Sequence, residues 1–368
     1  MTTSPSLLFV SNGYGEDLIG AHIALAAKSI GFYPIAFPLV GAGFGYLEHQ
    51  IDRVGTSPIP PSGGIMRRLR DVVGDLRNGI VATSLRQRRI ISQTASHCHG
   101  IVAVGDVFCL IQATAGKKLP AIFLPTAKSD LFMPHTPLEY WIIRRLADRI
   151  FPRDAITASR FNERQLPADY LGNPMMDGLL DLPPLRREIN GIHLALLPGS
   201  RSESSQNLEL ELRVLDHMSQ PIFAWICTSK SMDTHPHKSI LIAHNYTEIH
   251  SNRWVNPSGI TISFTHTFSS AVRAADVVIG LAGTANEQAV WLGKRVVAFP
   301  GSGPQSLPIR FNEQKKLLGN NLIYVDTNHP STVALKVMET LKLPPLPEPL
   351  PQHAASQIIH SARDLFEQ

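Results

Sequence analysis

Two short stretches of the sequence carry groups that suit a diphosphate. The first, 197–203, reads Leu-Pro-Gly-Ser-Arg-Ser-Glu and follows a continuous apolar run. Gly199 and Ser200 would present backbone N–H groups and a hydroxyl to phosphate oxygens, and Arg201 would add a cation with two parallel donors. The alternative interpretation is a helix cap at Ser200 or Ser202 beside a surface arginine. Three adjacent donors of this kind favour a phosphate-binding loop.

The second stretch, 280–287, reads Gly-Leu-Ala-Gly-Thr-Ala-Asn-Glu and also follows an apolar run. We expect Gly283 and Thr284 at a helix N-terminus, where free N–H groups and the helix dipole favour an anion. Glu287, one turn later, would accept hydrogen bonds from a ribose diol. The alternative is a capped helix with Glu287 in solvent. Two phosphate-suited loops in one half of the chain favour a diphosphate site more strongly than either loop does alone.

A third loop, 11–17, opens the chain's first predicted helix. It reads Ser-Asn-Gly-Tyr-Gly-Glu-Asp, and its two glycines allow positive φ and close approach of a ligand to the backbone. Neither this loop nor 41–45 has the third glycine of a dinucleotide fingerprint, and the sequence has no Walker loop. These absences disfavour a nicotinamide or ATP enzyme. The alternative for each loop is a tight strand-to-helix turn without a ligand. The residues of this loop that we assign to the acceptor side are Asn12, Gly13 and Gly15.

The elements that must position these loops alternate between strands and helices. Short apolar runs recur along the chain, and most are continuous, as in strands that are buried on both faces. They fall at 7–11, 35–39, 101–104, 121–124, 192–197, 222–227, 260–264, 277–279, 296–299 and 322–325. Helical spacing at 17–29 and 285–292 completes the alternation. The sequence therefore predicts the α/β class with two parallel sheets, whose ligand-binding loops lie where the strands end.

Proline and charge mark the boundaries between the expected domains. The segment 175–191 combines both features, which are typical of exposed connecting chain. We expect an N-terminal domain over 1–180 and a C-terminal domain over 185–345. Five prolines in 343–351 exclude a helix there. The last piece, 352–368, regains a helical pattern and is expected to dock back across the domains.

Composition excludes several classes of protein. Of 368 residues, 43% are hydrophobic and 17% charged, which is enough for real cores and too little charge for a disordered chain. The net charge of +4 is too small for a chain that coats nucleic acid. No apolar run reaches the ~18 residues of a membrane-spanning helix, and the first residues lack the basic start of a signal peptide. We expect a cytoplasmic protein with no nucleic-acid partner.

The sequence also lacks the usual residues of a metal site. The three cysteines have no C-x-x-C spacing, and no two aspartates are spaced D-x-D, the pair with which many sugar transferases hold a metal ion. We therefore expect no metal and no cofactor. A diphosphate would be held by cationic side chains and helix N-termini instead.

Taken together, these motifs resemble the lipid-A-disaccharide synthases. The resemblance rests on 196–201 (Leu-Leu-Pro-Gly-Ser-Arg), on 283–287 (Gly-Thr-Ala-Asn-Glu), and on 170–177, which is similar to that family's hinge segment. Phe311–Gln314 is similar to the stretch that supplies a sugar-contacting Gln in the related transferase that completes lipid II. The first loop lacks the family's serine, and 104–106 supplies one aspartate where the family has two. The departures lie in the acceptor half, and the donor motifs match better.

The resemblance implies the GT-B architecture, two Rossmann-like domains that face a cleft. It implies an inverting, metal-independent glycosyltransferase that moves a sugar, such as an N-acetylglucosamine derivative, from a UDP-sugar to a lipid or lipid-linked acceptor. Arg201, Ser200 and the helix N-termini would stabilise the departing diphosphate. Glu287 would hold the ribose, and Gln314 would orient the sugar.

An acceptor hydroxyl needs a general base on the acceptor side. Asp106 is the first candidate because it ends a buried strand, and Asp130 and Glu16 are reserves. Asp106 has an alternative role as a helix cap or as the partner of a nearby arginine. Lys128 belongs to the same group of acceptor-side loop residues.

A basic stretch at 65–91 predicts contact with an anionic membrane surface. It holds seven arginines against two aspartates, with apolar residues interleaved at near-helical spacing. We therefore expect peripheral association with the inner face of the membrane. The alternative is a packed helix with a solvated basic face. RNA binding is disfavoured because few aromatic residues accompany the arginines.

Two other functions remain open from the sequence. A UDP-sugar 2-epimerase or hydrolase shares the expected architecture and the donor loops, and it would act without an acceptor. A non-catalytic sensor of nucleotide sugars would bind the donor and leave it intact.

Overall fold

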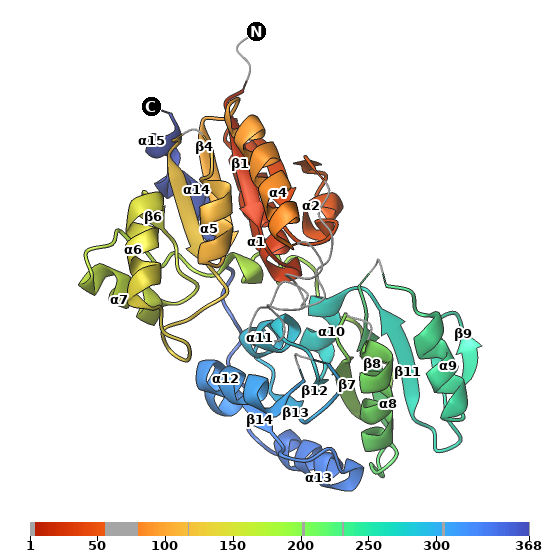
Figure 1. Ribbon diagram of the computed structural model, residues 1–368. Coiled ribbons are helices and arrows are strands. Elements are labelled where there is room, and N and C mark those ends of the chain that lie inside the picture. Colours follow the sequence, from red (N-terminus) through yellow and green to blue (C-terminus); the bar gives the residue numbers. More distant parts are fainter. Residues whose placement is uncertain are drawn as a thin grey trace. The chain divides into compact units, whose positions relative to one another are not determined.

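The computed structural model describes residues 4–55, 80–116, 118–200, 203–229, 232–303 and 306–367. The chain divides into two compact units, which Figure 1 shows in colours that follow the sequence. The first unit is formed by Met1–Asp177 together with Gln352–Gln368, and the second by Gly178–Pro351. The C-terminal segment therefore belongs to the first unit.

The first unit is built on a six-stranded parallel sheet in the order β3-β2-β1-β4-β5-β6. Its strands are β1 (Ser6–Ser11), β2 (Tyr33–Pro38), β3 (Asp52–Arg53), β4 (Gly100–Gly105), β5 (Ala121–Pro125) and β6 (Arg149–Ile150). Every residue of β4 and β5 is buried, which explains their continuous apolar sequence. The order reverses direction between β1 and β4, the neighbouring strands at the centre of the sheet.

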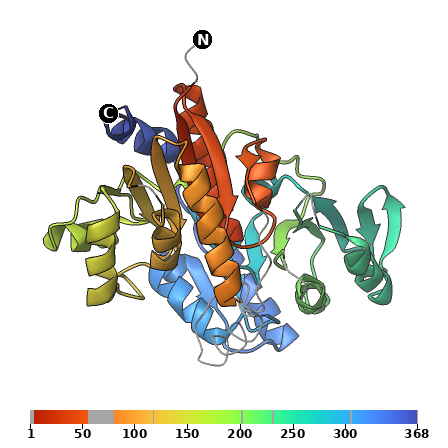
Figure 2. The same ribbon diagram turned by 45° about the horizontal axis from the view of Figure 1, so that its top comes forward.

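Helices cover both faces of this first sheet. They are α1 (Tyr14–Ser29), α2 (Phe44–Glu48), α4 (Ile80–Ala95), α5 (Val107–Ala113), α6 (Pro137–Leu146) and α7 (Ala155–Glu163), with a 3-10 turn η1 (Pro174–Met176). The helices α4 and α5 lie in front of the sheet in Figures 1 and 2. α5 packs between α4 and α6, and α1 packs against α2.

The C-terminal segment, α14 (Ala354–Ser361) and α15 (Arg363–Phe366), completes the first unit. α14 lies against α1. The carboxylate of Asp177 accepts hydrogen bonds from the amides of Ala354 and Ala355 at 3.1 and 2.7 Å, so it caps this helix where the chain returns. The ring of Phe366 packs edge-on against Phe32.

The second unit has an eight-stranded sheet in the order β14-β13-β12-β7-β8-β11-β10-β9. Its strands are β7 (Ile192–Leu197), β8 (Ile222–Cys227), β9 (Thr247–His250), β10 (Arg253–Val255), β11 (Thr261–Thr265), β12 (Val277–Gly280), β13 (Val296–Ala298) and β14 (Leu322–Tyr324). At one edge β10 pairs antiparallel with both β9 and β11, and the other six strands pair in parallel. Those six repeat the strand order of the first unit, with the reversal between β7 and β12.

The helices of the second unit are α8 (Ser204–Leu215), α9 (His235–Ala243), α10 (Phe268–Ala274), α11 (Thr284–Trp291), α12 (Pro308–Leu318) and α13 (Pro330–Leu341), with a 3-10 turn η2 (Gly319–Asn321). α8 contacts both α9 and α13. The predicted α/β class with two Rossmann-like parallel sheets is confirmed.

Candidate functional site

The two phosphate-suited loops of the second unit lie at the reversal of its strand order. One follows β7 and the other follows β12, and these strands are hydrogen-bonded neighbours. In an open parallel sheet the crevice beyond such a pair of strand ends is where ligands bind. The structure thus brings together two loops that are more than eighty residues apart in the sequence.

The loop after β7 has an open backbone at its glycine. Gly199 has φ of +97°, and no described atom lies within 4 Å of where a Cβ would stand. Ser200 next to it is exposed. Arg201, the cation that we predicted beside them, lies outside the described residues.

The loop after β12 ends at the N-terminus of α11. Gly283 is the N-cap residue of the helix and, having no side chain, makes no side-chain capping hydrogen bond. Thr284 is exposed, and Glu287 is partly buried one turn into the helix. The amide of Asn286 donates to the carbonyl of Gly283 at 3.2 Å, and an anion at this helix N-terminus would be received by the amides of Thr284 and Ala285.

Buried amide side chains tie the loops of this edge together. Asn207 of α8, 1% exposed, donates to the carbonyl of Pro198 at 3.0 Å and accepts from the amide of Ser302 at 2.7 Å. The hydroxyl of Ser306 donates to the carbonyl of Leu281 at 2.8 Å. These bonds link the loops that follow β7, β12 and β13. A single Asn inside a helical pattern gives no sequence signal for such a role.

Gln314 of α12 belongs to the same set of ties. Its amide nitrogen donates to the carbonyl of Gly283 at 2.9 Å, and its oxygen accepts from Asn286 at 3.4 Å. Both amides are buried. Gln314, which the resemblance placed on the donor sugar, here supports the loop at the start of α11 from within the unit.

The first unit has a matching site at the ends of β1 and β4. Asn12 follows β1, and its Oδ1 lies only 1.9 Å from where a Cβ would stand on Gly105, the last residue of β4. Because Gly105 has φ of +145° and no side chain, the two loops can meet at this point. The structure thus places Asn12 directly beside the backbone that leads to Asp106.

Asp106 is the N-cap of α5. Its Oδ1 accepts a hydrogen bond from the amide of Cys109 at 2.9 Å. Burial raises the pKa of this carboxyl, and the backbone N–H groups at the start of α5 oppose that rise. The cap that we weighed as an alternative role is therefore present. It leaves a carboxylate with a raised pKa at the centre of the sheet edge.

Glu16 lies in the first turn of α1 and folds back over the loop. Its Oε2 is 2.3 Å from where a Cβ would stand on Gly13, so a side chain at Gly13 would displace the carboxylate. Gly13 itself is extended, with φ of −176°, and Gly15 is part of the helix. A side chain at position 13 would therefore shift a flexible carboxylate, and the extended backbone there does not itself favour glycine.

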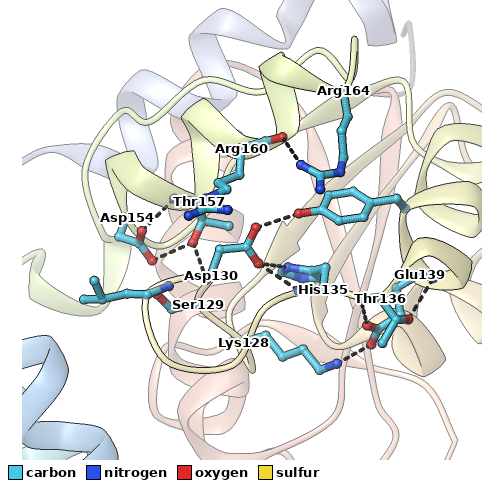
Figure 3. A network of polar contacts seen from close by, with 12 residues as sticks. Lys128, Ser129, Asp130, His135, Thr136, Glu139, Asp154, Thr157, Arg160 and Arg164 are labelled. Atoms are coloured by element: carbon cyan, nitrogen blue, oxygen red, sulfur yellow. Dashed lines mark hydrogen bonds and ion pairs between the residues drawn. The ribbon is translucent and has the colours of Figure 1, made fainter.

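Asp130, a reserve candidate for the base, is engaged in a buried network after β5 (Figure 3). One carboxylate oxygen accepts from Nδ1 of His135 at 2.7 Å and the other from the hydroxyl of Tyr140 at 2.6 Å. These hydrogen bonds lower the pKa of Asp130 although burial opposes them. The Asp130 amide donates to Thr157, whose hydroxyl in turn donates to Asp154. These contacts hold the loop that carries Asp130 in place.

Lys128 lies in the same loop and pairs with Glu139 of α6. The ammonium and the carboxylate are 2.5 Å apart, and about one fifth of each side chain is exposed. Glu139 also completes a capping box with Thr136 at the start of α6. The charge of Lys128 is therefore held in place at the edge of the sheet.

The part of the chain that the structure describes holds no group of three or more His, Cys, Asp or Glu side chains placed to bind a metal ion. None of the helices in these residues combines the length and the hydrophobicity of a membrane-spanning segment.

Comparisons with known proteins agree on the fold. No protein-family model and no curated protein sequence matches the chain. Solved structures do match over almost its whole length. The UDP-GlcNAc 2-epimerase from Neisseria meningitidis bound to UDP-GlcNAc has a TM-score of 0.57 at 12% identity, over 97% of this chain and 99% of that one.

Two further structures give similar values. MurG from Acinetobacter baumannii has a TM-score of 0.52 at 11% identity, over 98% of this chain and 95% of that one. The calicheamicin glycosyltransferase CalG4 has a TM-score of 0.58 at 12% identity, over 100% and 95%. At such identities the likeness establishes the fold alone, which is the architecture shared by these nucleotide-sugar enzymes.

Proposed function

We propose that this protein is an inverting, metal-independent glycosyltransferase that moves a sugar from a UDP-sugar to a lipid or lipid-linked acceptor. The observation that carries the proposal is the edge of the second sheet. There, two phosphate-suited loops lie side by side and are braced by buried amides from α8 and α12. The fold shared with nucleotide-sugar enzymes supports the choice of donor.

The donor site follows from the groups at that edge. The open backbone at Gly199 and the first-turn amides of α11 would receive the diphosphate. Arg201, with its two parallel donors, would stabilise the charge that develops on the leaving diphosphate. Glu287 would hold the ribose. Because Gln314 is bound within the unit, it would act on the sugar through the position of Gly283.

Asp106 is the group that we assign as general base. It would take the proton of the acceptor hydroxyl while the hydroxyl oxygen bonds to the anomeric carbon and the bond from that carbon to the diphosphate breaks. UDP leaves with the bonding electron pair, and the configuration inverts. A carboxyl with a raised pKa is a stronger base than an ordinary aspartate, which suits this step. Glu16 is the reserve, since Asp130 is engaged in its own network.

The outer surface of α4 and α6 supports contact with an anionic membrane. Leu85, Leu138 and Trp141 are 63%, 65% and 53% exposed. The helices α4, α5 and α6 together carry five exposed arginines, and their only acidic residue, Glu139, is paired with Lys128. Arg145 lies over the ring of Trp141. Residues 65–79 of the predicted basic stretch lie outside the described residues, and 80–91 belong to α4.

Exposed apolar and basic side chains on one helical layer are suited to the interface of an anionic bilayer. We expect the protein to sediment with vesicles that contain phosphatidylglycerol and not with phosphatidylcholine alone. Leu138→Ser should weaken that binding, and Leu335→Ser should not, since Leu335 is equally exposed on α13 of the other unit. Equal binding by both variants would show that α6 is not part of the membrane-binding surface.

A second candidate function is a UDP-sugar 2-epimerase or hydrolase. The likeness to a UDP-GlcNAc 2-epimerase over 97% of the chain favours it, because the two activities share one architecture. Such an enzyme would release UDP or change the sugar without an acceptor.

The experiment that separates these functions is a panel of UDP-sugars with EDTA present. Thermal shift identifies the donor, and UDP release is then followed with and without a membrane-lipid extract. Release that needs the extract and survives EDTA is the result we expect. UDP release or a changed sugar without the extract would establish the second candidate, and the absence of a shift with every UDP-sugar would refute the donor site.

A further inference from the structure

Three polar side chains meet in the core of the first unit, directly below the loop at 12–16. The hydroxyl of Ser11 donates to Oδ1 of Asp17 at 2.6 Å, and the hydroxyl of Tyr46 donates to Ser11 at 3.1 Å. All three residues are 0% exposed. They come from the end of β1, the first turns of α1, and α2, and we call them the Ser11–Asp17–Tyr46 junction.

Two glycines give the junction its space. A Cβ on Gly20 would lie 2.1 Å from the Tyr46 hydroxyl, and a Cβ on Gly45 would lie 2.6 Å from the backbone nitrogen of Leu18. Gly45 belongs to the Gly-Ala-Gly-Phe-Gly run at 41–45, which does not match the dinucleotide-binding fingerprint. In the structure this run brings α2 against α1, and Tyr46 thereby reaches the end of β1.

The junction is connected to the acceptor-side loop by the backbone. The amide of Asp17 donates to the carbonyl of Gly13 at 2.8 Å, and the amide of Leu39 donates to the carbonyl of Ser11 at 2.7 Å. Asn12 follows Ser11 directly and lies against Gly105, the residue before Asp106. A displacement of Ser11 or Asp17 would therefore move Asn12 and Glu16 relative to Asp106.

We propose that Ser11, Asp17 and Tyr46 are positioning residues that hold the loop at 12–16 in register with Asp106. They would act through Asn12 and Glu16 without touching a substrate. The inference rests on the proposed function for its catalytic consequence, and the geometry of the loop can be tested without any turnover.

The charge of Asp17 adds a dependence on pH. No described residue makes a hydrogen bond to its Oδ2. The titratable groups that act on the junction are Glu16 on the same helix, Tyr46 on α2, Arg53 on β3 and Cys109 on α5. Burial raises the pKa of Asp17 to about 7. We expect the junction to be tightest at pH 6, where Asp17 is protonated, and looser at pH 8.

The test is amide hydrogen exchange, corrected for the intrinsic rate, at Asp17 and Leu39 between pH 6 and 8. Tyr46→Phe removes one buried hydrogen bond and should speed exchange at both amides about tenfold, with Val102 of β4 unchanged. Asp17→Asn keeps an acceptor for Ser11 and should abolish the pH dependence, whereas Asp17→Ala should speed exchange at every pH. Tyr246→Phe is the control, since it removes a buried hydroxyl of the second unit that no described residue bonds.

Kinetics give a second readout where the wild type releases UDP. Tyr46→Phe should lower kcat about tenfold and leave KM for the UDP-sugar unchanged, because the donor loops belong to the other unit. Exchange that rises equally at Asp17, Leu39 and Val102 would make the junction merely structural and overturn the proposal. The proposal would also be overturned if the exchange rates at Asp17 and Leu39 in Tyr46→Phe equalled those in the control Tyr246→Phe. A wild type without turnover would refute the proposed function, and the exchange result would still decide the junction.

Discussion

Truncating the ring of Phe366 tests whether the last residues of the chain are part of the first unit's core. Phe366 is 3% exposed and packs edge-on against Phe32, with the ring centroids 6.0 Å apart. Its ring also covers Gly100 at the start of β4, where a Cβ would lie 2.2 Å from the ring. The glycine is thus the space into which the phenylalanine fits. Both contacts of Phe366 join residues that are more than 260 positions apart in the sequence.

The expected loss follows from the burial of the ring. Phe366→Ala removes a fully packed aromatic side chain and leaves a cavity on the sheet, and such changes cost about 3–5 kcal/mol. Since the contact lies within the first unit, the free energy of unfolding should fall for that unit alone. Leu350→Ala is the control because Leu350 is 82% exposed, and we expect it to change the stability of neither unit.

The assay is urea unfolding monitored by pulsed hydrogen exchange. Peptides from β1 and β7 report the unfolding of the two units separately. The β1 midpoint should move to lower urea in Phe366→Ala, with the β7 midpoint unchanged. A loss below about 1 kcal/mol would show that the C-terminal segment merely lies on the surface. An equal shift of both midpoints would show that the two units unfold as one.

Three further predictions concern the site and its support. Burial raises the pKa of Glu211 well above 4.5, so the free energy of unfolding should fall by up to about 1.4 kcal/mol per pH unit as pH rises above 4.5. Urea unfolding of Glu211→Gln should lack this pH dependence, and parallel curves for the two proteins would contradict the prediction. Asn207→Ala removes the bonds between the loops after β7 and β13, and we expect a loss of about 1–3 kcal/mol together with a weaker thermal shift by the UDP-sugar. Asp106→Asn should lower UDP release by ~10²–10⁴-fold with donor binding intact, and a loss below tenfold in a folded variant would exclude it as the base.

Most of the sheet could be predicted because a strand buried on both faces leaves a continuous apolar run. The predicted runs at 192–197 and 222–227 coincide with β7 and β8, and the run at 7–11 differs from β1 by one residue. The antiparallel strands β9 and β10 were not predicted. β9 reads Thr-Glu-Ile-His with every residue exposed, so it carries no apolar run, and its pairing comes from its place at the sheet edge.

The positions of the loops could be predicted from the sequence, but the contacts of their side chains could not. Gly-rich turns after apolar runs identified the edges where β1, β7 and β12 end. Asp106 and Asp130 both follow buried strands and look alike in the sequence. The tertiary structure shows that their surroundings differ. His135 and Tyr140 donate to the two carboxylate oxygens of Asp130, whereas Asp106 caps a helix and has a raised pKa.

The sequence by itself determined the α/β class, the alternation of elements and the loops that follow the strands, because hydrophobic periodicity and backbone freedom are local properties. Only the tertiary structure decided which loops meet, that Asn207 and Gln314 brace them, and that the last helix completes the first unit. These features depend on contacts between residues far apart in the chain. No local pattern encodes them, since a buried Asn or an apolar helix face does not specify its partner.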